Sequence, residues 1–292
     1  MSNFSLKSVA MLVETNFSVW TARKLDRKQS ADVVTVTGAT NKGAARVNKN
    51  LLAGRTELED VGRLVTEIRN YVMLNTLPWS DNGQRLLIGA RFVKFNNTME
   101  DYKESFEDKV ASFVNIYPTL ITAQAMALGA MFDRAEFPPA SEIAHKFNMG
   151  FVYLPVPAAG DLRVDIGNQA QDEIRAKLET LANARVSKAV QDMQDKFVAH
   201  LQRMAARLTD TTDAKTGEPV VSRLHETLVS SAFELCDLVY DYGVLADSKL
   251  VQARQDLEKA LADVTINTLR DNPDKRKEIN TAVSSILNKF SL

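Results

Sequence analysis

The segment LPWSDNGQRLLIGARFVKF, residues 77–95, interrupts a long helical pattern and decides how the surrounding elements can be arranged. Pro78 disfavours helical geometry at Leu77, because the proline ring clashes with the backbone of the preceding residue. Ser80–Gly83 has the composition of a turn, since Asn-Gly readily supplies positive φ angles. Residues 86–95 follow this turn and are expected to form a strand. The segment is therefore predicted to be a corner of the fold.

Strand patterns occur in three regions of the chain. Residues 86–95 end in an alternating run, in which Phe92 and Lys94 face one way and Val93 and Phe95 the other. Residues 8–22 alternate in their second half, and the β-branched run at 31–37 favours a strand, with a helix as the alternative. Residues 151–166 are expected to form a hairpin whose returning strand is 162–166. We expect these regions to share one small sheet.

Apolar residues spaced three and four apart predict helices through most of the remaining chain. The longest pattern extends over residues 168–208 and has its clearest stripe from Val186 to Leu208. Pro118 lies inside another pattern, and proline removes a helical hydrogen bond, so a kink or break is expected there. The predicted helices are residues 56–77, a segment from 97 or 98 through the Pro118 region, 168–208, 221–242, 244–269 and 273–290.

These patterns predict a mainly α fold with a small β component, of the α+β class. Long helices are expected to pack on, or extend from, a small antiparallel sheet. The sequence suggests a mixed α/β domain over residues 1–166. It also suggests a long-helix region over residues 167–292, either a helical bundle or coiled-coil-like.

Composition favours a protein of the cytoplasm. The 292 residues contain no apolar run of about 18 residues, the length that a membrane-spanning helix needs. The first residues lack the long apolar core of a signal peptide. A single cysteine, Cys236, excludes an intramolecular disulfide and fits a reducing compartment. We therefore expect no membrane partner.

Positive charge is concentrated near the start of the chain. Residues 1–55 carry a net charge of +6, whereas the whole chain carries −1. Such a basic segment is a known indication of contact with nucleic acid, but the more common explanation is that exposed basic residues keep a strand edge soluble. Trp20 beside the basic cluster could stack on a single-stranded base, or could belong to the core. The candidate nucleic-acid-binding residues are Trp20, Arg23, Lys24, Arg27, Lys28, Lys42, Arg46, Lys49 and Arg55.

No motif predicts a catalytic, cofactor or metal site. Residues 38–43 have the Gly-x-x-x-x-Gly spacing of a phosphate loop, but Ala44 and Ala45 replace the Lys and Ser/Thr that contact phosphate and magnesium. The three histidines, His145, His200 and His225, are isolated and lack metal-ligand spacing. Cys236 has apolar neighbours, as a buried structural thiol does. Glu100, Glu104 and Asp108 share one helix face, which is more typical of a solvated face than of a metal site.

Four segments occur in a recognisable order along the chain. They are SVWTARKL at 18–25, RVNKNLL at 46–52, the Leu77-Pro78-Trp79 corner with Gly83, Arg85, Leu86 and Leu87, and Phe137-Pro138 with Glu142-Ile143 and Lys146-Phe147. Together they resemble a family of tailed-bacteriophage proteins of unknown function, which are mostly helical and of similar length. The resemblance covers roughly residues 13–170 and implies no site residue, because none of its motifs is tied to a known activity. Genes of this family can lie near genes for AAA ATPases and von Willebrand-type proteins, which would imply an accessory role.

The sequence thus leads to a non-enzymatic phage protein of the host cytoplasm, which oligomerises or binds a phage or host protein through its long helices. The alternative is an accessory protein that binds single-stranded DNA through residues 23–55. An enzyme whose site is assembled from distant residues stays open, because sequence alone cannot show such a site.

Overall fold

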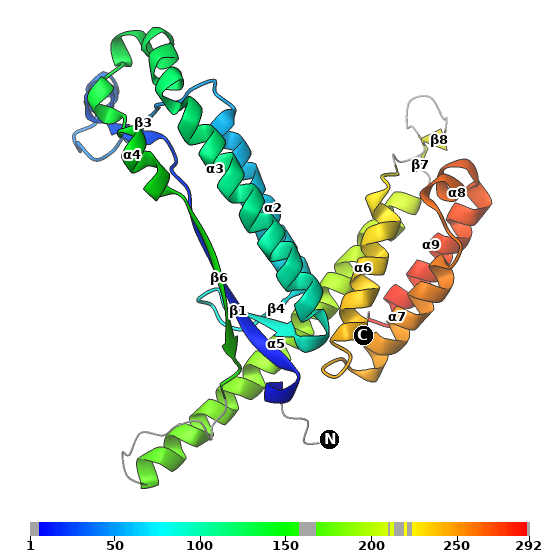
Figure 1. Cartoon of the computed structure of the whole chain (residues 1–292). Helices are drawn as coiled ribbons and strands as arrows, with labels where there is room; N and C mark the ends of the chain where they lie inside the picture. Colours follow the sequence, from blue (N-terminus) through cyan, green and yellow to red (C-terminus); the bar gives the residue numbers. More distant parts are fainter. Residues whose placement is uncertain (1–5, 158–167, 210, 213–218, 221–223, 291–292) are drawn as a thin grey trace. The chain divides into compact units, whose positions relative to one another are not determined.

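The computed structural model describes residues 6–157, 168–209, 211–212, 219–220 and 224–290, and the fold is mainly helical with a small β component (Figure 1). The helices are α1 (Arg27–Val36), α2 (Glu57–Asn75), α3 (Phe92–Leu128), α4 (Ala140–Ile143), α5 (Asn168–Leu208), α6 (Thr227–Asp241), α7 (Ser248–Leu261), α8 (Ile266–Asp271) and α9 (Pro273–Asn288). Short 3₁₀ helices are η1 (Leu6–Ser8), η2 (Gly89–Arg91), η3 (Gly129–Met131), η4 (Arg134–Glu136) and η5 (Ala144–Lys146).

The strands form three small sheets in the described part of the chain. The largest has the order β4-β5-β1-β6, and β1 pairs antiparallel with β5 so that Ala10 lies opposite Ile88. The prediction that the regions 8–37, 86–95 and 151–166 share one sheet is therefore confirmed for the strands at Ala10–Ser18, Arg85–Ile88 and Asn148–Pro155. The strand Arg23–Asp26 of the first region pairs in a separate sheet, and residues 162–166 lie outside the described residues. The strands are β1 (Ala10–Ser18), β2 (Arg23–Asp26), β3 (Val47–Asn50), β4 (Leu77–Pro78), β5 (Arg85–Ile88), β6 (Asn148–Pro155), β7 (Thr211–Thr212) and β8 (Pro219–Val220).

The chain forms two compact units that do not follow its order in sequence. The first unit consists of Met1–Glu14, Leu74–Val93 and Tyr153–Leu292. The second consists of Thr15–Met73 and Lys94–Val152. The two units group residues by their contacts and do not test where one domain ends and the next begins. The boundary between residues 166 and 167 therefore stays a prediction.

The turn in the segment 77–95 has the predicted geometry. Gly83 has a φ of 91°, and its amide donates to the Ser80 carbonyl at 3.3 Å. The amides of Trp79 and Ser80 both donate to the Gln84 carbonyl at 3.1 Å. These bonds close the turn between β4 and β5 and hold Trp79 in the core, where its side chain is 2% exposed.

Two strand predictions are wrong. Residues 31–37 lie largely in α1, which the Asp26 carboxylate caps by accepting from the Gln29 amide at 3.0 Å. Ser30 Oγ then accepts from the Val47 amide at 3.0 Å and joins α1 to β3. Capping and packing therefore outweigh the weak strand preference of β-branched residues. Residues 92–95 open α3 rather than extending β5, which ends at Ile88.

The helix α3 owes its start at Phe92 to a buried face that repeats at helical spacing. Phe95, Met99 and Phe106 are buried in the second unit, and the stripe continues further along the helix. Tyr71 of α2 stacks on Phe95 at 5.5 Å between ring centroids. The helix continues through Pro118, so the predicted break of the helix at this residue is wrong. Packing of the flanking buried residues holds the helix together where the proline lacks its amide hydrogen.

The first unit contains a helical core built on α5. The predicted stripe is confirmed, because Met193, Phe197 and Leu201 are fully buried together with residues of α9 such as Ile279 and Val283. Figure 1 shows the second half of α5 beside α6, α7 and α9. The predicted helix 244–269 is two helices, α7 and α8, separated near Asp263, whose φ is 59°.

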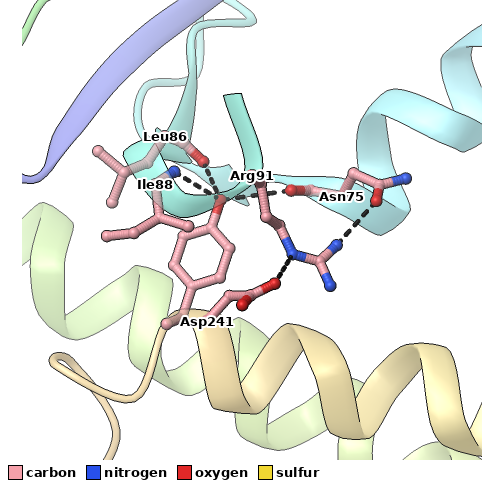
Figure 2. Close-up of polar contacts among 6 residues, drawn as sticks. Asn75, Leu86, Ile88, Arg91 and Asp241 are labelled. Atoms are coloured by element: carbon pink, nitrogen blue, oxygen red, sulfur yellow. Dashed lines mark hydrogen bonds and ion pairs between the residues drawn. The ribbon is translucent and has the colours of Figure 1, made fainter. Parts of the chain in front are cut away.

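A buried tyrosine joins the corner segment to α6 within the first unit (Figure 2). The Tyr242 hydroxyl lies 2.8 Å from the Leu86 carbonyl and 3.3 Å from the Asn75 carbonyl, and it accepts from the Ile88 amide at 3.2 Å. The residue has no exposed surface. These contacts satisfy the backbone polar groups where β5 ends.

Candidate nucleic-acid interface

Most of the predicted basic residues lie on a small folded element of the second unit, formed by β2, α1 and β3. The two strands pair antiparallel, with Arg23 opposite Asn50 and Lys24 opposite Lys49. α1 begins at Arg27, directly after β2. The basic residues of the strand and of the first helical turn are therefore close together in sequence. We call this element, residues 23–50, the basic module.

Six of the candidate side chains are exposed, and all six belong to the basic module. Charges that remain hydrated can exchange water and counterions for phosphate groups. Asp26, the acid nearest to them in sequence, uses its carboxylate to cap α1, and Asp32 is exposed beside them. The exposed candidates are Arg23, Lys24, Arg27, Lys28, Lys42 and Arg46.

Lys49 takes a structural position instead of an exposed one. Its side chain is 6% exposed, lies 2.5 Å from the Glu136 carboxylate and donates to the Met131 carbonyl at 2.6 Å. A buried ion pair that is also hydrogen-bonded holds neighbouring segments in register, and loss of one partner leaves a buried charge. Lys49 therefore offers no charge to a ligand, and Arg55, just before α2, is only half-exposed.

Trp20 packs in an aromatic cluster of the second unit. Its ring meets Tyr117 of α3 edge-on at 5.6 Å between centroids and lies 6.4 Å from Phe113. The side chain is half-buried. These contacts favour the core interpretation of Trp20 over stacking on a base, because aromatic partners within the protein already engage the ring.

The loop over residues 38–43 lacks the setting of a phosphate loop. It follows α1, whereas such a loop follows a strand. Its positive φ at Gly38 and the hydrogen bond from the Gly43 amide to Asn41 Oδ1, at 2.8 Å, form local turns. This geometry matches the absence of Lys and Ser/Thr at positions 44 and 45.

The other residues singled out in the sequence are dispersed. Glu100, Glu104 and Asp108 are all exposed, as expected of a solvated helix face. Among the residues that the structure describes, no group of three or more His, Cys, Asp and Glu side chains is placed to hold a metal ion.

Burial, with a smaller contribution from Glu258, raises the pKa of Cys236 to about 12. A thiol with so high a pKa is a poor nucleophile at neutral pH.

One group of residues could not be found from sequence. His200, Arg203 and His225 line a cavity in the first unit, between α5 and the start of α6. The spacing of His200 and Arg203 places them on one face of α5, but nothing in the sequence brings that face to His225.

No family model matches the sequence, and neither a curated protein nor a solved structure shows a match. In the described part of the chain, none of the helices is long and apolar enough to cross a membrane.

Proposed function

We propose that this chain is a non-enzymatic accessory protein that self-associates through the first part of α5. The observation that carries the proposal is the burial pattern of this 41-residue helix. From Ala189 onward, buried side chains recur at helical spacing, whereas none of the side chains at residues 169–184 is buried. We call residues 169–184 the α5 arm; Figure 1 shows that it extends beyond the α6, α7 and α9 bundle of the same unit.

The α5 arm carries an apolar stripe of which no side chain is buried. Ile174, Leu178 and Leu181 follow spacings of four and three, and Leu181 is 45% exposed. An apolar stripe on a helix that is otherwise polar favours association with another helix. Because the arm is about 24 Å long, a single helix of similar length could cover it.

A second copy of the chain fits the arm by charge. Asp172 and Glu173 lie near its start, and Arg185 follows its end. Two arms paired antiparallel about Leu178 bring the acids of one copy near the arginine of the other. Opposite charges flanking an apolar seam favour that orientation. The contact is small, so a dissociation constant of roughly micromolar size is expected.

Light scattering over a concentration series tests self-association. The wild type is expected to shift from monomer to dimer at roughly micromolar concentration, and Leu181→Asp is expected to remain monomeric. Val244→Asp is the matched control, because Val244 is 47% exposed in the same unit but lies outside the arm. A wild type that stays monomeric at every concentration, or a control that dissociates like Leu181→Asp, contradicts the proposal. Binding of the arm to a different protein would appear as a complex that Leu181→Asp also abolishes.

The exposed basic module supports a second candidate function, the binding of single-stranded nucleic acid. Contacts to phosphate release counterions, so affinity should fall steeply as salt rises. Gel shifts with single- and double-stranded DNA at low and moderate salt measure this. Replacing Arg23, Lys24 and Arg27 by alanine should weaken binding, whereas Lys94→Ala and Lys109→Ala, which remove exposed charges elsewhere in the unit, should not. The absence of any shift at low salt excludes this function.

The resemblance to tailed-bacteriophage proteins supports a setting in the cytoplasm of an infected host cell. In that setting, the arm or the basic module would serve a phage or host assembly rather than a reaction. Pull-downs from infected cells with the wild type and with Leu181→Asp would identify a partner that depends on the arm.

A further inference from the structure

A cavity of about 320 Å³ opens between the second half of α5 and the start of α6 in the first unit. Its lining from α5 includes His200, Arg203 and Arg207, which share one helix face. Its lining from the other side includes His225, Thr227 and Ser231. Both sides thus contribute side chains that can donate hydrogen bonds, and among the residues that the structure describes no carboxylate lines the cavity.

The wall on the α6 side is held in place by α8. Nε and a terminal nitrogen of Arg270 donate to the Leu224 carbonyl at 3.1 and 2.7 Å. The Leu228 amide then donates to the His225 carbonyl at 3.0 Å and closes the first turn of α6. These bonds position His225 and Thr227 before any ligand arrives.

His200 is a buried polar side chain with an unused ring nitrogen. It is 7% exposed, and its Nε2 is buried without a hydrogen-bond partner among the described residues. An unpaired polar group in the interior costs stability unless a partner from outside the chain completes it. Because the ring lines the cavity, a bound ligand is such a partner.

The two arginines of the cavity have no carboxylate partner in the part of the chain that the structure describes. Nε of Arg203 donates only a long bond, of 3.3 Å, to the Ala199 carbonyl on its own helix. Both side chains are exposed, so their guanidinium groups can turn toward a ligand. Glu226, the acid next to His225, is also exposed and does not line the cavity.

We propose that this cavity binds a small phosphate-bearing molecule through Arg203, Arg207 and His200. Planar guanidinium groups match phosphate oxygens with paired hydrogen bonds, and the hydroxyls of Thr227 and Ser231 add neutral donors. The start of α6 contributes the positive end of a helix dipole. The volume is at the lower end of the range for ligand pockets, which suits a phosphate or a phosphate monoester rather than a dinucleotide. This site is separate in sequence from the α5 arm and from the basic module.

Isothermal titration calorimetry with inorganic phosphate and with adenosine monophosphate, at constant ionic strength, tests the site on the full chain. Saturable binding is expected, and Arg203→Ala and Arg207→Ala should each weaken it about tenfold or more. Arg175→Ala is the matched control, since Arg175 is an exposed arginine on the same helix outside the cavity, and it should bind like the wild type. Tighter binding of the nucleotide would show that the apolar walls receive its base and sugar, whereas equal affinities would assign the site to the phosphate group alone.

A second variant separates ligand binding from folding. His200→Leu removes the unpaired nitrogen and fills its place with an apolar side chain, so it should weaken phosphate binding while the unliganded protein stays folded at neutral pH. The proposal is overturned if phosphate shows no saturation up to roughly 10 mM, or if Arg175→Ala weakens binding as much as Arg203→Ala. Displacement of phosphate by an oligonucleotide that binds far more tightly would also overturn it, because the cavity would then serve a nucleic-acid backbone.

Discussion

Arg91 Nε donates to the Asp241 carboxylate at 2.7 Å and thereby joins the end of the corner segment to the last residue of α6. A terminal nitrogen of the same guanidinium donates to Asn75 Oδ1, also at 2.7 Å. Directly beside this pair, the Tyr242 hydroxyl meets the backbone of Leu86 and Ile88 (Figure 2). The corner that interrupts the helical pattern is therefore fixed by side chains more than 140 residues away in sequence.

Replacing Tyr242 by phenylalanine should lower the free energy of unfolding by about 1–3 kcal/mol, because it leaves the buried Leu86 carbonyl and Ile88 amide without their hydroxyl partner. Urea unfolding followed by circular dichroism measures the change. Tyr240→Phe is the matched control, since Tyr240 is 68% exposed and should lose little. Equal losses in the two variants would show that the buried hydroxyl has no special role.

The corner segment also shows how far sequence alone could lead. Proline and Asn-Gly rules act on neighbouring residues, so the turn at Ser80–Gly83 and the sheet shared by distant segments were predictable. Residues 92–95 were misread because four alternating residues fit a strand, whereas the helical repeat becomes clear only when Phe95 is read together with Met99 and Phe106.

The candidate sites also differ in how far the sequence could predict them. The basic module was visible as an uneven charge distribution, because composition needs no knowledge of contacts. The ion pair of Lys49 with Glu136 joins residues far apart in sequence, and no local rule could have removed Lys49 from the candidate set. The cavity at His200 depends on where α6 begins relative to α5, which is a property of packing.

Cys236 should react slowly with Ellman's reagent in the folded protein, since burial raises the pKa of its thiol to about 12. At mildly alkaline pH the rate should be at least about 100-fold below that of the urea-unfolded chain. The raised pKa means that its contribution to stability is complete below the ordinary thiol pKa and is lost as pH rises toward about 12. A folded-state rate close to the unfolded one would mean that the thiol is accessible.

Acid should destabilise the first unit through His200. Burial, with a smaller contribution from Arg203, lowers the pKa of this imidazole from its ordinary value of 6.5, and a backbone hydrogen bond with Leu228 opposes the shift. Arg207 and His225 also line the cavity. The unfolded state then binds the proton more tightly, so stability is lost as pH falls below 6.5. Melting temperatures between neutral and mildly acidic pH should show a smaller loss for His200→Leu than for the wild type; identical losses would remove His200 as a cause.

Pro118→Ala should stabilise the second unit, because α3 continues through an exposed proline. Alanine restores the missing amide hydrogen and removes the ring from the preceding turn, a gain of up to about 3 kcal/mol. The freer unfolded chain reduces the gain by about 0.4–1 kcal/mol. Thermal unfolding should therefore shift upward. Pro139→Ala, at the extended residue before α4, is the control that should not gain stability. A lower melting temperature for Pro118→Ala would contradict a continuous, well-packed α3.

Disulfide trapping at the α5 arm tests the central claim most directly. Cys236 is buried, so a cysteine introduced at Leu178, the position where the two antiparallel arms meet their own copies, would be the reactive thiol of the described chain. Under mild oxidation near roughly micromolar concentration, Leu178→Cys is expected to yield a disulfide-linked dimer, and Val244→Cys is expected to remain monomeric. A dimer band that is absent from Leu178→Cys, or equally strong in Val244→Cys, would contradict self-association through the arm.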